Sequence, residues 1–245
     1  NPKNIVIAAV GDIDSRATLK LINRCFGKLP ALKETTTEIP AEPAQKEQRK
    51  IEVEFDANPS LIVGYHKPAP PAFDDYVFDV METILTKGRT SRLYSELVLS
   101  RQVADSVSAY NGLPASRYPN LFAISADPRH PHSCDEVLAA LDEEIEKLKT
   151  EQIPDMELSK AKKQIKMDFI KGLNSNSSLA STLSYHELLM GDYRYFSSYT
   201  QQIDKVSAAD IQQAAMKYLT EKNRTVAVLK KESKQPQKEM IENEK

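Results

Sequence analysis

The first apolar segment of this chain cannot bury itself. Residues 5–10 form a continuous apolar run rich in β-branched side chains, which predicts a strand buried on both faces. A turn at residues 11–14 leads into a helical pattern, with Asp14 as the N-cap and Gly27 where the helix would end. One strand and one helix do not make a core, so residues 1–30 need a partner in this chain or in another segment.

The start of the chain and two polar stretches set the expected boundaries. The sequence begins at Asn1 without an initiator Met or a signal peptide, as expected for a piece of a longer protein or for a processed end. Residues 31–49 are rich in Pro, Glu, Thr and Lys, which predicts a linker. Residues 50–230 carry the regular patterns of a domain, and the charged residues 231–245 predict a disordered tail.

The patterns after the linker change from alternating to mainly helical. The expected strands are residues 51–55, which alternate strictly and so predict a half-buried strand, and residues 61–65, 107–109, 121–126 and 225–229. The expected helices are residues 73–88, 90–101, 137–148, 158–169, 179–190, 195–203 and 207–219. The last of these opens on Ser207 with Asp210 three residues later, a capping-box pattern. This order predicts an α+β fold with a largely antiparallel sheet covered by helices on one face.

Composition excludes several classes of function. The 245 residues are 40% hydrophobic and 28% charged, enough for one core or one core plus a fragment of another. The net charge of -2 provides no basic stripe for nucleic acid. No apolar run approaches the roughly 20 residues that cross a bilayer. Cys25 and Cys134 follow no pattern and are interpreted as small buried hydrophobes, although a single disulfide stays open.

The histidines do not form a metal motif. They are His66, His130, His132 and His186. His130 and His132 flank a proline in a predicted surface turn, which rules out a regular helix there. His186 precedes a glutamate, but Met190 stands where a second helical ligand would be needed. The sequence therefore predicts no metal site in this chain, and His186 is interpreted as a helix-surface or partly buried residue.

Other catalytic patterns are also missing from the sequence. It contains no G-x-S-x-G elbow, no phosphate-binding glycine loop and no C-x-x-C pair. Two acidic pairs, Asp74-Asp75 and Glu143-Glu144, lie in predicted helices, where adjacent side chains point apart. We interpret both pairs as solvated faces. The residues alone thus indicate an α+β domain without chemistry of its own.

Four stretches, in order along residues 4–230, together resemble the pitrilysin/insulinase family of zinc metallopeptidases. The nearest branch is the short bacterial and mitochondrial-processing-peptidase-like one. The sharpest match is Gly-Arg-Thr-Ser-Arg-Leu-Tyr at residues 88–94, which is similar to a signature after the first long helix of the second half of these proteins. The other matching stretches are residues 10–30, 64–68 and 104–110.

The resemblance implies a LuxS/pitrilysin-like half and a function for it. In this family two related α+β halves close around an unfolded peptide, and the first half holds zinc through an inverted His-x-x-Glu-His motif plus a distal Glu. Residues 50–230 would be the C-terminal, non-catalytic half, with residues 1–30 a junction segment that can belong to the preceding half. The chain alone would then be no enzyme and would need no cofactor, with zinc only in the other half.

The same resemblance implies partners and a location. The expected partner is the N-terminal zinc-bearing half or a separate subunit, the parent protein would act on peptides, and self-association is another way to cover residues 1–30. Bacterial relatives are often exported, which favours the cell envelope or periplasm. An alternative is an inactive scaffold or assembly subunit with the same fold. An inverted zinc motif in the sequence before Asn1 would favour the peptidase.

This sequence departs from the family where the second half would hold peptide. Many members supply an Arg and a Tyr seven residues apart, but Val98 and Asp105 stand at those positions here. Arg101 and Tyr110 are nearby with a spacing of nine, so one gap does not restore the pair. We therefore predict no catalytic and no substrate-anchoring residue, and a role as a structural wall.

Overall fold

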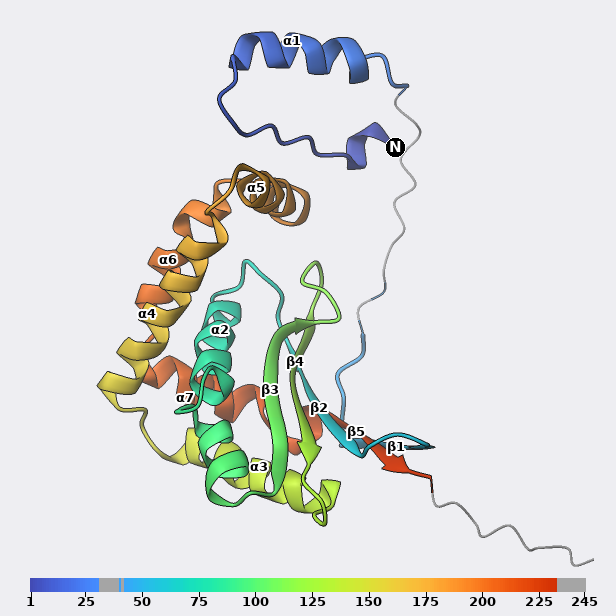
Figure 1. Ribbon diagram of the computed structural model, residues 1–245, viewed down its shortest axis with the longest axis vertical. Coiled ribbons are helices and arrows are strands. Elements are labelled where there is room, and N and C mark those ends of the chain that lie inside the picture. Colours follow the sequence, from blue (N-terminus) through green and yellow to red (C-terminus); the bar gives the residue numbers. More distant parts are fainter. Residues whose placement is uncertain (31–39, 41, 233–245) are drawn as a thin grey trace, which may run out of the picture.

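The sheet of this protein contains five strands in the order β1-β5-β2-β4-β3, within the residues that the structure describes. The computed structural model describes residues 1–30, 40 and 42–232 (Figure 1). The strands are β1 (Arg49–Phe55), β2 (Ser60–Lys67), β3 (Ala104–Leu113), β4 (Asn120–Pro128) and β5 (Arg224–Lys231). β1 pairs with β5 in parallel, and the other three pairings are antiparallel. The prediction of a largely antiparallel sheet is confirmed.

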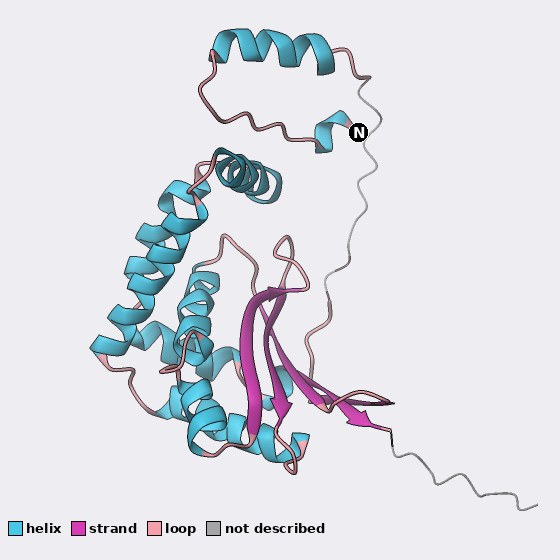
Figure 2. Ribbon diagram, in the orientation of Figure 1, coloured by secondary structure: helices cyan, strands magenta, loops and turns pink. Residues whose placement is uncertain are grey.

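The described residues also contain seven α-helices. They are α1 (Ser15–Phe26), α2 (Phe73–Thr86), α3 (Cys134–Thr150), α4 (Asp155–Gly172), α5 (Asn176–Met190), α6 (Tyr195–Lys205) and α7 (Ala208–Tyr218). Of these, α2, α3 and α7 pack on one face of this sheet, while α1 lies apart from it (Figure 2). Short turns occupy η1 (Pro2–Asn4) and η3 (Glu221–Asn223), and η2 (Tyr94–Ser100) is a π-helix. The α+β class and its helical layer agree with the sequence prediction.

The core lies between the sheet and α2, α3 and α7. In β2, Leu61 and Val63 are fully buried while Ile62 between them is 47% exposed, so alternate residues face the helices. Phe78 of α2 packs on Phe122 of β4 with ring centroids 5.0 Å apart. Apolar residues that recur along the helices fill the remaining space.

The helix caps form as the sequence predicts. The Asp14 carboxylate accepts hydrogen bonds from the backbone N–H groups of Arg16 and Ala17 at the start of α1. Ser207 and Asp210 form a reciprocal capping box at α7. Each cap satisfies N–H groups that have no partner inside the helix.

The strand predicted at residues 5–10 does not form. The segment has no regular secondary structure, and its alternate residues Ile5 and Ile7 are exposed. A strand needs a neighbour for its backbone groups, and none of the described strands pairs with this one. The segment has the β-branched composition of a strand, but no described strand lies beside it.

The half-buried character predicted for residues 51–55 is wrong. All seven residues of β1 are exposed, although the strand itself forms. β1 lies at the edge of the sheet beside β5, beyond the part that the helical layer covers (Figure 2). Both of its faces therefore stay open.

The prediction that both acidic pairs are solvated is wrong for the second member of each. Asp75 is 7% exposed and forms an ion pair with Lys67, and Glu144 is 4% exposed with Lys147 Nζ 2.5 Å from its Oε1. The first members, Asp74 and Glu143, lie nearer the surface. Adjacent side chains on a helix point apart, and for that reason one of each pair turns inward.

The remaining predictions concern the cysteines and the chain boundaries. Both thiols are free; Cys134 is buried as predicted, whereas Cys25 is exposed. The predicted linker and tail fall largely on residues 31–39, 41 and 233–245, which lie outside the described residues. In the described part of the chain, no helix is long and apolar enough to cross a bilayer.

Candidate functional site

The sheet face that points away from the helices, here called the open face, carries exposed apolar side chains. Ile51 of β1 lies opposite Ala227, which in turn lies opposite Ile62 of β2, so the two isoleucines share one row across the sheet. Val53 and Phe55 continue this face along β1 and are more than half exposed. Apolar surface gathered on one face marks a contact with another body.

Residues 1–30 form a second unburied apolar surface. None of these thirty residues, all of which the structure describes, is buried. The exposed apolar residues in this stretch are Ile5, Ile7, Ile13, Leu19, Leu21, Phe26 and Leu29. Figure 1 shows α1 lying apart from the layers formed by the sheet and the other helices. Within the part of the chain that the structure describes, the segment therefore lacks the partner that its composition requires.

The two positions expected to hold peptide in relatives have other roles here. Val98 in η2 is 6% exposed and belongs to the core. Asp105 in β3 is exposed and accepts a hydrogen bond from Arg129 Nε at 2.8 Å. Arg101 is engaged by Glu96 and Glu143, with N–O distances of 2.7 and 2.5 Å. The loss of the anchoring pair stays a prediction.

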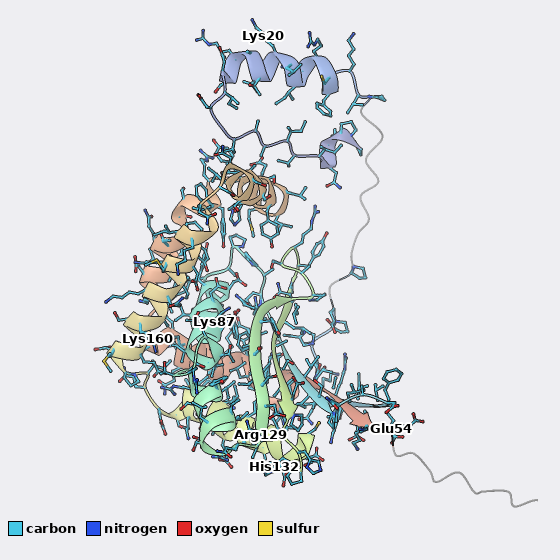
Figure 3. The ribbon with its side chains drawn as sticks, viewed as in Figure 1. Lys20, Glu54, Lys87, Arg129, His132 and Lys160 are labelled. Carbon is cyan, nitrogen blue, oxygen red and sulfur yellow. The ribbon has the colours of Figure 1, made fainter. Side chains whose placement is uncertain are left out.

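The histidines are dispersed, as their sequence spacing suggests. His132 lies with Arg129 at the end of the sheet far from α5 (Figure 3), and its Nδ1 is 3.1 Å from Glu136. His66 is on β2, and His186 is in α5. The described residues contain no group of three or more His, Cys, Asp or Glu side chains placed to hold a metal. The side chains present in the described residues therefore do not fit a zinc site.

A cavity of about 610 Å³, here called the Asp79 pocket, opens among α2, α4, α5 and α6. Asp79 and Glu82 of α2, Asp168 and Phe169 of α4, His186 of α5 and Tyr199 of α6 line it. Lys87, beside α2 in Figure 3, also lines the pocket and lies 3.3 Å from Glu82. Its size is that of a ligand site, and its walls mix carboxylates with aromatic rings.

The carboxylate of Asp79 is held in place from two sides. Asn111 Nδ2 donates to its Oδ1 at 2.8 Å, and the Tyr199 hydroxyl donates to its Oδ2, also at 2.8 Å. Burial nevertheless raises the pKa of Asp79 to about 7. Burial also lowers the pKa of His186, whose buried Nδ1 has no hydrogen-bond partner among the described residues.

The amino-acid sequence alone does not predict this pocket. Its residues are spread over 120 positions, from Asp79 to Tyr199, and share no local spacing. The available signal was weak: Asp79 and Glu82 are three residues apart on a helix whose other residues are mostly apolar. Only the packing of α4 and α6 against α2, and of α5 against α6, brings the lining together.

Comparisons with known proteins agree on one family. A family model described as "Peptidase M16 inactive domain" matches residues 1–165. The zinc protease PqqE of Helicobacter pylori is 29% identical over 234 residues, which cover 94% of this chain and 52% of that protein. The chain spans about half the length of the curated relatives it matches.

Solved structures give the same result. A crystal structure of a protease from Helicobacter pylori matches with a TM-score of 0.82 and 27% identity, covering 90% of this chain and 54% of that chain. The inactive peptidase domain of a putative zinc protease from Bordetella parapertussis matches with a TM-score of 0.63. At 24% identity this second likeness concerns the fold alone; it covers 71% of this chain and 93% of that one.

Proposed function

Because the chain belongs to the peptidase M16 inactive-domain family, we propose that it is the non-catalytic wall of a peptide chamber whose opposite half carries zinc. One observation carries this proposal: residues 1–30 expose their apolar side chains and bury none. That surface requires another body, and the zinc-bearing half is the partner that fits this family. Residues 1–30 are then a junction with that half, residues 31–49 the linker and residues 50–230 the wall domain.

The open face supports the role of a wall. It presents Ile51, Val53, Phe55 and Ile62 to solvent without a helix over them in the described residues. An unfolded peptide could contact such a surface through its apolar side chains without being held in one register. A wall of this kind contributes by positioning the substrate and does no chemistry itself.

The outer edge of β3 is not available for a peptide strand at two of its residues. The backbone N–H of Ala109 donates to Thr86 Oγ1 at 3.1 Å, and that of Asn111 donates to Glu82 Oε2 at 2.9 Å. Both acceptors belong to α2, which therefore covers this edge. Peptides that add to a sheet need free backbone groups at its edge. Contact through the open face fits these residues better than strand addition.

The proposal is tested by joining this chain with the zinc-bearing half from its own source and measuring hydrolysis of an unfolded, fluorescence-quenched peptide. We expect hydrolysis only when both halves are present, and its loss on adding a chelator. In the joined protein, Ile62→Asp on the open face should lower kcat/KM roughly tenfold, because one apolar contact with the substrate becomes a desolvated charge. Met156→Asp is the matched control, since Met156 is 84% exposed on α4.

Three results would contradict the proposal or part of it. Chelator-sensitive hydrolysis by this chain alone would place the chemistry here. A stable complex with the zinc-bearing half that hydrolyses nothing would instead support the scaffold alternative. Equal activity of the Ile62→Asp and Met156→Asp proteins would show that the open face does not contact the substrate during hydrolysis.

We also propose a location in the bacterial cell envelope or periplasm, because the periplasmic protease PqqL from Escherichia coli shares this fold. Cell fractionation with an antibody to this chain tests it. The protein should appear in the periplasmic fraction, and recovery with cytoplasmic markers alone would contradict the proposal.

A further inference from the structure

The Asp79 pocket has a charge that selects its ligand. Three carboxylates, Asp79, Glu82 and Asp168, line it. Among the described lining residues Lys87 is the cation, and its ammonium group is already 3.3 Å from Glu82. Asp168 accepts hydrogen bonds only from the neutral amide of Gln164 among the bonds found in the described residues. The pocket therefore attracts cations and repels anions.

Aromatic rings make one wall of the pocket. Phe169 stacks on Tyr199 with ring centroids 5.3 Å apart and an interplanar angle of 29°. Tyr185, from α5, adds a third ring beside His186. Faces of aromatic rings attract ammonium and guanidinium groups and also pack against apolar stems. A simple metal ion would use none of this surface.

We propose that the Asp79 pocket binds the basic side chain, arginine or lysine, of a peptide. The carboxylates would receive the charged head, and the Phe169–Tyr199 wall would pack on its methylene stem. The volume of about 610 Å³ exceeds one side chain, and the mouth includes the exposed residues Lys87 and Asp168, so peptide residues on either side of the basic one also fit. The choice of a peptide over a free amine rests on the proposed function; because the pocket lies among helices and not on the open face, the basic residue belongs to a part of the peptide beyond the contact with that face.

Binding in this pocket depends on pH through Asp79. The Asn111 amide of β3 donates a hydrogen bond to the Asp79 carboxylate. The charged and titratable groups around that carboxylate come from α2, α4, α5 and α6 and from Lys87 beside α2; they are Asp75, Glu82, Lys87, Asp168, His186, Tyr195 and Tyr199. A bound cation favours the ionised carboxylate, whose pKa in the free protein is about 7. Affinity for a basic peptide should therefore rise from pH 6 to pH 8, by up to about tenfold.

The experiment measures binding of short fluorescent peptides to the full chain by anisotropy. The peptides differ at one central residue, which is arginine, lysine, citrulline or glutamate; citrulline keeps the shape of arginine without its charge. We expect the arginine and lysine peptides to bind at least about tenfold more tightly than the citrulline peptide. Agmatine, a free guanidinium compound, should bind more weakly than the arginine peptide.

Variants connect this binding to the pocket. Asp168→Asn removes an exposed charge and should weaken binding of the arginine peptide about three- to tenfold. Glu146→Gln, on α3 and outside the pocket, is the charge-matched control and should change nothing. Asp79→Asn should abolish the pH dependence. A melting curve shows whether the Asp79→Asn protein folds. If it does not, Asp168→Asn and the peptide series still test whether the pocket binds basic side chains.

Three results would overturn the inference: equal binding of the arginine and citrulline peptides, an unchanged affinity in Asp168→Asn, or agmatine binding as tightly as the peptide. The last would identify a small-amine site. Binding to the pocket is measured on this chain alone, whereas the wall function is measured by peptide hydrolysis in the presence of the zinc-bearing half. Either can therefore fail without the other.

Discussion

Lys67 and Asp75 form a buried ion pair at the junction of β2 and α2. The Lys67 side chain is fully buried, and its ammonium group also donates to the Pro68 carbonyl at 3.1 Å and lies 5.7 Å from the Phe78 ring centroid. Burial raises the pKa of Asp75, while Lys67 favours its ionised form. Charges withdrawn from water depend on each other, because either one alone would be left unpaired.

Asp75→Ala should therefore lower the free energy of unfolding by about 3–5 kcal/mol, since it leaves the Lys67 charge buried without its partner. Urea denaturation measures this. Arg194→Ala is the control: it breaks an exposed pair with Asp192, so it should change the free energy of unfolding very little. A double variant, Lys67→Met with Asp75→Leu, should recover much of the loss. Equal costs for Asp75→Ala and Arg194→Ala would contradict the prediction.

Titration of Asp79 should make the free energy of unfolding decrease as the pH rises. Its folded pKa of about 7 lies above the ordinary value of 3.8, so the folded state binds a proton that the unfolded chain releases between these values. Stability should then decrease as the pH rises from 4 to 7, by about 2–4 kcal/mol from this group. In unfolding free energies measured across that range, the wild type should lose stability relative to Asp79→Asn, because the asparagine side chain stays neutral. Parallel curves would show that Asp79 titrates normally.

At the scale of elements, α1 and α7 differ in what holds them. Both have a side-chain N-cap, Asp14 in α1 and Ser207 in α7. α7 buries Ile211 and Ala215 in the core, whereas α1 buries none of its residues. A helix of twelve residues without tertiary contacts is marginal in water. α1 should therefore open separately from the rest of the molecule.

The same cap deletion should have different effects in these two helices. Ser207→Ala should lower the global unfolding free energy by about 1 kcal/mol, because α7 is part of the cooperative core. Asp14→Ala should leave it unchanged and instead speed amide hydrogen exchange within α1. Denaturant unfolding and hydrogen exchange measure the two quantities. A global loss from Asp14→Ala would show that α1 packs on the core after all.

Elements with a local signal could be predicted from the sequence, and those that depend on distant partners could not. Periodicity predicts α3 and α4 closely, and periodicity with a capping box predicts α7, because an amphipathic helix carries its own pattern. Residues 5–10 have the composition of a strand, but none of the described strands pairs with them. The Asp79 pocket was equally hidden, since α2 forms it together with α4, α5 and α6 from a much later part of the chain.

At the scale of the whole molecule, two unburied apolar surfaces remain: residues 1–30 and the open face. The two need not behave alike. A wall that meets unfolded peptides stays accessible by function, while a junction segment is covered permanently by its partner. Removing the junction should therefore affect assembly and leave the fold of the remaining chain intact.

Deletion of residues 1–30 tests this difference. None of them is buried, and β1 begins only at Arg49, so the shortened chain should unfold in urea within about 0.5 kcal/mol of the intact one. Sedimentation should show that the intact chain self-associates or binds the zinc-bearing half and that the shortened chain does neither, because the apolar surface is gone. Ile5→Asp with Ile7→Asp should reproduce this loss without shortening the chain, while Lys20→Asp on α1 should not. The assignment of residues 1–30 as a junction would be contradicted if the intact chain were monomeric alone and did not bind the zinc-bearing half.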